Sequence, residues 1–196
     1  VASPTVASGS TVLSRLRAKD AAGNFLTTGG ANIGFSYAGG TSTGTIGTVS
    51  NVGDGTYTAL FTGGTAGTAT AISATVEGDA IGTAAANLTV TAGAIAATRS
   101  VISVSSPTVA SGNTVTLTLT ARDAQGNAVT TGGATIVFSH TGGSSTGTIG
   151  TVGDNSNGTY TAQFTGVISG SATSIRATIN GDSVTTTLPT VSVTPG

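Results

Sequence analysis

The sequence predicts an all-β protein made of two tandem β-sandwich domains, and three observations lead to this prediction. The chain is rich in β-branched Thr and Val and poor in strong helix formers. A segment of about the length of one domain occurs twice. Within each copy, apolar and polar residues alternate over short runs, which is the pattern of half-buried strands.

The repeat defines the expected domain organisation. Residues 3–93 align with residues 106–196 at a constant offset of 103 positions, without a gap. A period of this length suits a domain that folds by itself better than a solenoid unit. We therefore expect one domain over 1–93, a linker and the start of the first strand over 94–103, and a second domain over 104–196. Val1 corresponds to Val104, so we expect a piece of a longer array of repeats.

The alternation assigns about seven strands to each repeat, and Gly-rich turns between them favour a sandwich. In the first repeat we expect strands near Val6 and over 12–18, 33–37, 45–49, 57–61, 72–76 and 88–90, and in the second at the equivalent positions. The residues expected to form the core are Phe35, Tyr57, Phe61, Leu119, Phe138, Tyr160 and Phe164.

Two motifs recur in the same order in both repeats. The long second strand ends in a D-x-x-G-N turn at residues 20–24 and 123–127, and a G-T-Y-T-A segment follows at 55–59 and 158–162. With Gly67 or Gly170 opening the next strand, this set resembles the bacterial immunoglobulin-like domains of group 1, the repeated modules of invasin- and intimin-type adhesins. The resemblance covers nearly all of both repeats. It departs where that family usually has Pro after the Asn, because Phe25 and Ala128 stand there.

This resemblance implies two immunoglobulin-like β-sandwiches, an extracellular or bacterial cell-surface location, and neighbouring repeats of the same chain as partners. The residues expected to shape the turns are Asp20, Gly23, Asn24, Asp123, Gly126 and Asn127. Asp accepts hydrogen bonds from nearby backbone amides, while Gly and Asn tolerate positive φ. Calcium binding by the aspartates is the alternative, but it needs several converging oxygens, and the seven acidic residues are dispersed. No metal or cofactor is expected.

Catalysis is not favoured. G-x-S-x-G occurs at 40–44 and 143–147, but a nucleophile elbow needs a following helix and a His base. No helical pattern follows either match, and the one His of the chain, His140, lies in the second repeat. Cys is absent, which leaves no partner for a transition-metal site. The only Lys, Lys19, aligns with Arg122, so the second repeat cannot form a Lys–Asn isopeptide bond.

The charge balance excludes further classes. Six basic residues and a net charge of −1 give no surface for phosphates, so nucleic-acid binding is not expected, and no apolar run is long enough to span a membrane. We expect a non-catalytic structural spacer of a bacterial cell-surface or secreted adhesin-like protein. One alternative is a surface module that binds glycan or a host receptor. The other is an extracellular filament subunit, in which other copies of the chain complete an open sheet edge by strand complementation.

Overall fold

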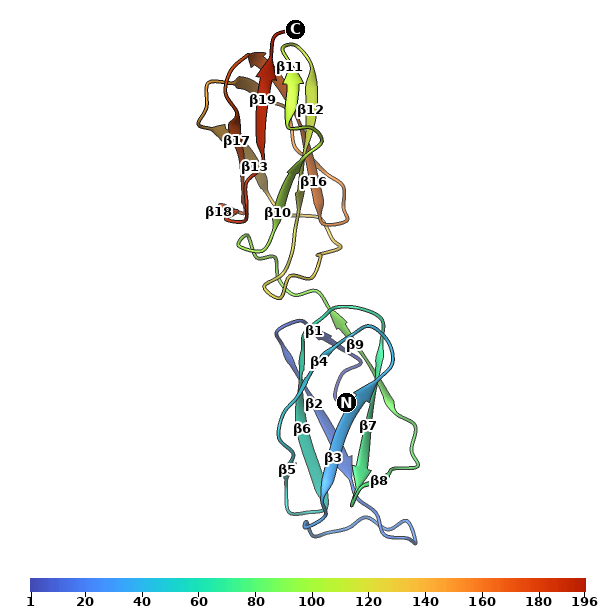
Figure 1. The fold of residues 1–196 in the computed structure, drawn as a ribbon. Coiled ribbons are helices and arrows are strands. Elements are labelled where there is room, and N and C mark those ends of the chain that lie inside the picture. Colours follow the sequence, from blue (N-terminus) through green and yellow to red (C-terminus); the bar gives the residue numbers. More distant parts are fainter. The chain divides into compact units, whose positions relative to one another are not determined.

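The computed structural model describes residues 1–196, which divide into two compact units, Val1–Gly93 and Ala94–Gly196. We call them repeat 1 and repeat 2. Both consist of strands and loops, and in each the strands form two sheets that pack face to face (Figure 1). The predicted fold class, two tandem all-β sandwiches, is confirmed. Residues 94–103 belong to repeat 2 by their contacts.

Repeat 1 contains nine strands. They are β1 (Thr5–Ala7), β2 (Thr11–Arg17), β3 (Ile33–Ala38), β4 (Gly44–Ile46), β5 (Ser50–Asn51), β6 (Thr56–Gly63), β7 (Thr70–Val76), β8 (Asp79–Ala80) and β9 (Ala86–Thr91). One sheet has the order β1-β9-β7-β3, and the other has the order β2-β6-β4. The two-residue strands β8 and β5 pair with β7 and β6. The β1–β9 pair is parallel.

Repeat 2 has the same plan with one additional strand. Its strands are β10 (Val101–Val104), β11 (Thr108–Ala110), β12 (Thr114–Thr120), β13 (Ile136–Thr141), β14 (Thr146–Ile149), β15 (Gly153–Asp154), β16 (Thr159–Ile168), β17 (Thr173–Ile179), β18 (Asp182–Ser183) and β19 (Thr190–Thr194). The sheets are β11-β19-β17-β13 and β10-β12-β16-β14. The additional strand is β10, which makes β12 an inner strand, whereas its counterpart β2 is an edge strand.

One expected strand is shorter than predicted. We expected a strand over residues 45–49, but β4 ends at Ile46 and β5 begins at Ser50. Both strands pair with β6, and residues 47–49 interrupt that ladder. Val49 in this interruption is exposed, so it does not contribute to the core.

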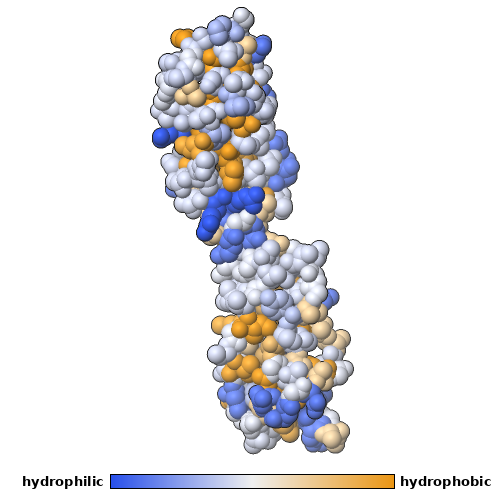
Figure 2. All heavy atoms as spheres, in the orientation of Figure 1, coloured by the Kyte–Doolittle hydropathy of each residue, from blue (hydrophilic) through white to orange (hydrophobic).

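Each repeat has its own core between the two sheets. In repeat 1 the largest fully buried side chains are Tyr57 and Phe61 of β6 and Leu88 of β9, and in repeat 2 Tyr160 and Phe164 of β16 occupy the equivalent positions. The alternation along β6 and β16 places these residues on the inward face. The outer surface carries mainly residues of intermediate hydropathy, with smaller apolar patches (Figure 2).

The Gly of the G-T-Y-T-A motif has a steric role in both repeats. Gly55 and Gly158 have φ values of 77° and 79°, in the left-handed region that glycine adopts without strain. A side chain at either position would collide with a backbone carbonyl, that of Leu26 or Val129. The motif therefore requires glycine where the loop after the D-x-x-G-N turn passes the start of the strand.

Candidate functional site

The D-x-x-G-N turn of repeat 1 is closed by the Asp20 carboxylate. The Asn24 backbone N–H donates to Asp20 Oδ1 at 2.8 Å, and the Asn24 side-chain amide donates to Oδ2 at 3.0 Å. The Gly23 N–H donates to the Asp20 carbonyl at 3.0 Å, with Gly23 at a φ of 89°. The carboxylate therefore accepts hydrogen bonds from the turn that it begins. These residues hold the loop, and the Asp20 side chain is exposed.

The turn of repeat 2 has the same geometry in a buried setting. Asp123 accepts from the Asn127 backbone and side-chain amides at 2.8 and 2.9 Å, and from the Gln125 N–H at 3.0 Å. Gly126 has a φ of 88°. Asp123 is 0% exposed, because residues 94–100 cover it: Ile95 forms a β-bridge with Asp123.

The hydrogen bonds to Asp20 predict a pH dependence of the stability of repeat 1. The Asn24 side-chain amide, and then its backbone N–H, hold the pKa of Asp20 below its ordinary value. A carboxylate with a lowered folded-state pKa stabilises the fold above the unfolded-state pKa, and this stabilisation is lost as the pH falls through the folded-state pKa. We expect Asp20→Asn to unfold at a lower temperature than the unmodified chain at pH 7, with the difference shrinking below about pH 4. Thermal unfolding between pH 7 and pH 2 measures this. A difference that is independent of pH would contradict it.

Repeat 1 has an exposed aromatic residue beside this turn. The Phe25 ring is 49% exposed, with Arg17 Cζ at 4.1 Å and Lys19 Nζ at 4.7 Å from its centroid. These are cation–π distances. Ala128 stands at the equivalent position of repeat 2, so this arrangement is specific to repeat 1.

The tyrosine of each G-T-Y-T-A motif is hydrogen-bonded to the loop that follows the D-x-x-G-N turn. The Ala31 N–H donates to the Tyr57 hydroxyl oxygen at 2.9 Å, and the Ala134 N–H donates to that of Tyr160 at 3.0 Å. The rings are 2% and 1% exposed. Each tyrosine therefore combines a core ring with a polar atom that holds the backbone after the turn.

His140 takes the place of a tyrosine. Tyr37 lies edge-to-face on Phe61 at 5.5 Å and donates to the Gly44 carbonyl at 2.8 Å. His140 lies edge-to-face on Phe164 at 5.6 Å, and its Nε2 is 3.2 Å from the Gly147 carbonyl. The histidine therefore reproduces a packing and hydrogen-bonding position of repeat 1. No three His, Asp or Glu side chains come together in a way that could hold a metal ion.

The serines of the two G-x-S-x-G matches bind backbone groups. Ser42 Oγ accepts from the Val90 N–H at 2.9 Å, and Ser145 Oγ accepts from the Val193 N–H at 2.9 Å. Ser145 Oγ also donates to the Gly170 carbonyl at 2.9 Å. Both serines are almost fully buried. The sequence analysis did not predict this role. The recurrence of serine at the equivalent positions 42 and 145 could have indicated a structural function.

This role predicts a loss of stability on removal of either hydroxyl. Ser42→Ala and Ser145→Ala leave a buried N–H of the last strand without an acceptor, which costs about 1–3 kcal/mol. Ser139→Ala is the matched control, because Ser139 is exposed on β13. Chemical unfolding of the three variants measures the differences. Equal stability of Ser145→Ala and Ser139→Ala would contradict the assignment.

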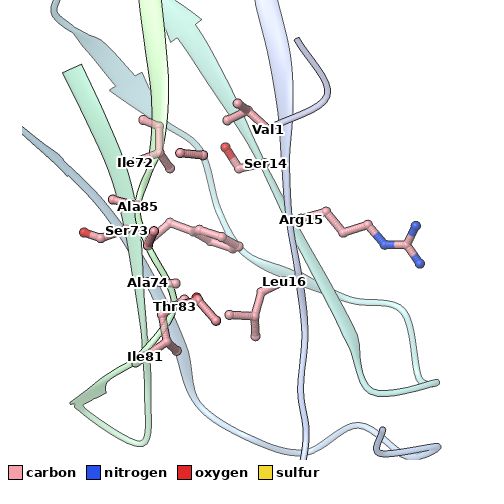
Figure 3. Close-up of a pocket in the computed structure, with 13 residues that line it drawn as sticks. Val1, Ser14, Arg15, Leu16, Ile72, Ser73, Ala74, Ile81, Thr83 and Ala85 are labelled. Atoms are coloured by element: carbon pink, nitrogen blue, oxygen red, sulfur yellow. The ribbon is translucent and has the colours of Figure 1, made fainter. Parts of the chain in front are cut away.

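A groove follows the free edge of β2 in repeat 1 (Figure 3). Ser14 and Leu16 of β2 point into it from one sheet, and Ile72 and Ala74 of β7 lie opposite, while the Arg15 side chain points away. The volume of this hollow is about 130 Å³. It is comparable to the cavity of about 150 Å³ that holds a benzene molecule in another protein. A single aliphatic side chain therefore fits into it.

These features define a class of protein, the tandem all-β sandwich repeat. The family described as Invasin, domain 3 matches residues 3–93 and 96–196. The chain belongs to this family. No curated protein matches the sequence. None of the chain forms a helix that is long and apolar enough to cross a membrane.

Solved structures of bacterial adhesins resemble the chain over nearly its whole length. The Escherichia coli adhesin FdeC is 29% identical with a TM-score of 0.58, over 98% of this chain and 62% of that one. InvD of Yersinia pseudotuberculosis is 29% identical with a TM-score of 0.51, over 98% of this chain and 55% of that one. Invasin, a bacterial integrin-binding protein, is 24% identical with a TM-score of 0.56, over 93% of this chain and 36% of that one, and supports the fold. The chain therefore spans less than two thirds of the length of these structures. The family match and these similarities identify it as an adhesin-type surface-protein module.

Proposed function

We propose that the chain is a non-catalytic structural spacer of a bacterial adhesin at the cell surface. One observation carries the proposal: the Asp of the D-x-x-G-N turn, the Ser of the G-x-S-x-G match and the Tyr of the G-T-Y-T-A segment recur in both repeats, and each is hydrogen-bonded within its own repeat. Asp123, Ser145 and Tyr160, like their counterparts in repeat 1, hold backbone groups of turns and strands. A repeated unit in which these three recurrent side chains hold its own turns and strands is suited to a mechanical role.

A display experiment tests this role. The chain is placed between a bacterial outer-membrane anchor and a small antigen-binding domain, and capture of antigen-coated beads is compared with a version from which the chain is deleted. We expect the chain to increase capture, because it extends the binding domain beyond the surface. An unrelated pair of β-sandwich domains of equal length should restore capture to the same level.

A second experiment tests whether the isolated chain binds a ligand by itself. Purified chain should bind neither cultured host cells nor a glycan array. Specific binding to either one would overturn the spacer proposal in favour of a binding module. A replacement pair of domains that fails to restore capture would also overturn it, because length alone would then be insufficient.

A further inference from the structure

Strand β13 of repeat 2 forms one edge of its sheet, next to β17 (Figure 1). Its residues, Ile136–Thr141, pair with β17 over their whole length without a bulge. They include no Pro, Lys, Arg, Asp or Glu. Edge strands of natural proteins usually carry such a residue or a bulge, because an open row of backbone groups otherwise pairs with another chain. The edge of β13 lacks these protective features.

Other edges of repeat 2 do have them. β14, at the edge of the second sheet, has a register shift between Thr146 and Gly147. β11, at the opposite edge of the sheet that contains β13, has three residues and directly follows Pro107. A bulge, a short strand and a proline each limit pairing with a further strand. At six residues, β13 is the longest edge strand of this repeat.

The open edge of β13 presents the backbone groups of alternate residues. The Asn180 N–H donates to the Thr135 carbonyl at 2.8 Å, so the backbone groups of the odd-numbered residues face β17. Those of Ile136, Phe138 and His140 therefore point away from β17, and no further strand of the chain pairs with them. These N–H and C=O groups form a row to which one more strand can be added.

The outer face of β13 carries an exposed apolar side chain. Val137 is 56% exposed, and its neighbour on β17 is Thr178. Gly34 stands at the equivalent position of repeat 1 and offers no side chain for a cross-strand contact. Valine stabilises a sheet mainly by packing against cross-strand neighbours. Val137 has such a neighbour on one side only, because β13 is an edge strand.

We propose that β13 pairs antiparallel with β13 of a second copy of the chain, in the register that places Val137 opposite Val137 of that copy. Ile136 of each copy is then hydrogen-bonded to Phe138 of the other, because the backbone groups of both residues point outward. The two Val137 residues form a non-hydrogen-bonded pair, in which the Cα atoms are about 4.5 Å apart and the side chains are close. This association is independent of the proposed spacer function.

A second copy is the occupant because the edge is complementary to itself. A two-fold axis between the strands brings the same groups of both copies together, as in an isologous interface. β13 carries no Lys, Arg, Asp or Glu, so the pairing does not place like charges opposite each other. Arg176 of β17 pairs with Ser139, so the two Arg176 residues lie on opposite sides of the axis. One strand from each copy buries little surface, so we expect a weak association that depends on concentration.

Cysteine cross-linking tests the register, because the chain has no Cys of its own. Val137→Cys chains are oxidised by dissolved oxygen with a copper catalyst, and oxygen takes up the two electrons and two protons released when two thiols form one disulfide. The expected Cα separation of about 4.5 Å lies within the range that a disulfide spans. We expect most of this variant to become a covalent dimer.

Ser139→Cys is the matched control, on the same strand and the same exposed face. In the proposed register Ser139 lies opposite Thr135 of the second copy, so Ser139→Cys chains should remain monomeric. A mixture of Ser139→Cys and Thr135→Cys chains should cross-link. Equal dimer formation by Val137→Cys and Ser139→Cys, or none by either variant, would overturn the proposal.

Amide hydrogen exchange of the unmodified chain tests the pairing without a cross-link. Exchange of the Ile136 and Phe138 amides should slow as the chain concentration rises, by about tenfold when roughly nine-tenths of the chains are paired. Val137→Lys should abolish this change, because it places like charges directly opposite each other. Thermal unfolding of this variant should match that of the unmodified chain, because Val137 is exposed.

Two outcomes of the exchange experiment would overturn the proposal. Slow exchange of the Ile136 and Phe138 amides even in dilute solution would show that the chain itself covers this edge. Protection by an added extended peptide, such as Thr-Val-Thr-Val-Thr, combined with no effect of chain concentration, would assign the edge to a segment of another protein.

Discussion

Phe61→Ala is expected to lower the free energy of unfolding of repeat 1 by about 3–5 kcal/mol, the range for removal of a buried phenyl ring. Phe61 is 0% exposed and packs with the other buried apolar residues of its core, and the Tyr37 ring lies edge-to-face on it. A domain of this size has a total stability of about 5–15 kcal/mol, so this loss is a large fraction of the whole. Phe164→Ala should have the same effect on repeat 2.

Leu60→Ala is the matched control for this prediction. Leu60 is the neighbour of Phe61 on β6, but it points to the opposite face and is 49% exposed. Its replacement should change the stability by no more than about 0.5 kcal/mol. Calorimetric unfolding of the unmodified chain and the variants measures both effects. Similar losses for Phe61→Ala and Leu60→Ala would contradict the assignment of the core.

Asp123→Ala should cost repeat 2 about 3 kcal/mol or more. The carboxylate is fully buried and accepts hydrogen bonds from the Asn127 backbone, the Asn127 side chain and the Gln125 N–H. Its removal leaves several donors without an acceptor beneath residues 94–100, and hydrogen bonds to charged groups contribute about 1.5–3 kcal/mol each. Chemical unfolding monitored by circular dichroism measures the loss.

Asp20→Ala is the comparison within the same molecule. The hydrogen bonds to Asp20 and Asp123 are similar, but Asp20 is exposed, so water can satisfy the donors that the mutation releases. We expect a clearly smaller loss in repeat 1. Equal losses for the two variants would show that burial by residues 94–100 does not control the strength of this turn.

The strands and the inward residues follow from the sequence because they depend on local alternation. Tyr57, Phe61, Tyr160 and Phe164 are all buried, as the period of two implies. The turn residues likewise follow from short-range chemistry, because Asp and Asn four positions apart can meet through their own side chains. Because the two repeats align at an offset of 103 residues, each strand and turn pattern occurs twice in the sequence.

The degree of burial was decided by the tertiary structure. Asp20 and Asp123 occupy the same motif, yet one is exposed and the other is fully buried, because residues 94–100 cover only the second. Phe35 and Phe138 differ for the same reason: β10 closes one flank of repeat 2, and the corresponding flank of repeat 1 is open. The sequence by itself therefore determined which residues face inward, because that depends on the pleat of each strand. Only the packing of segments distant along the chain determined what covers them.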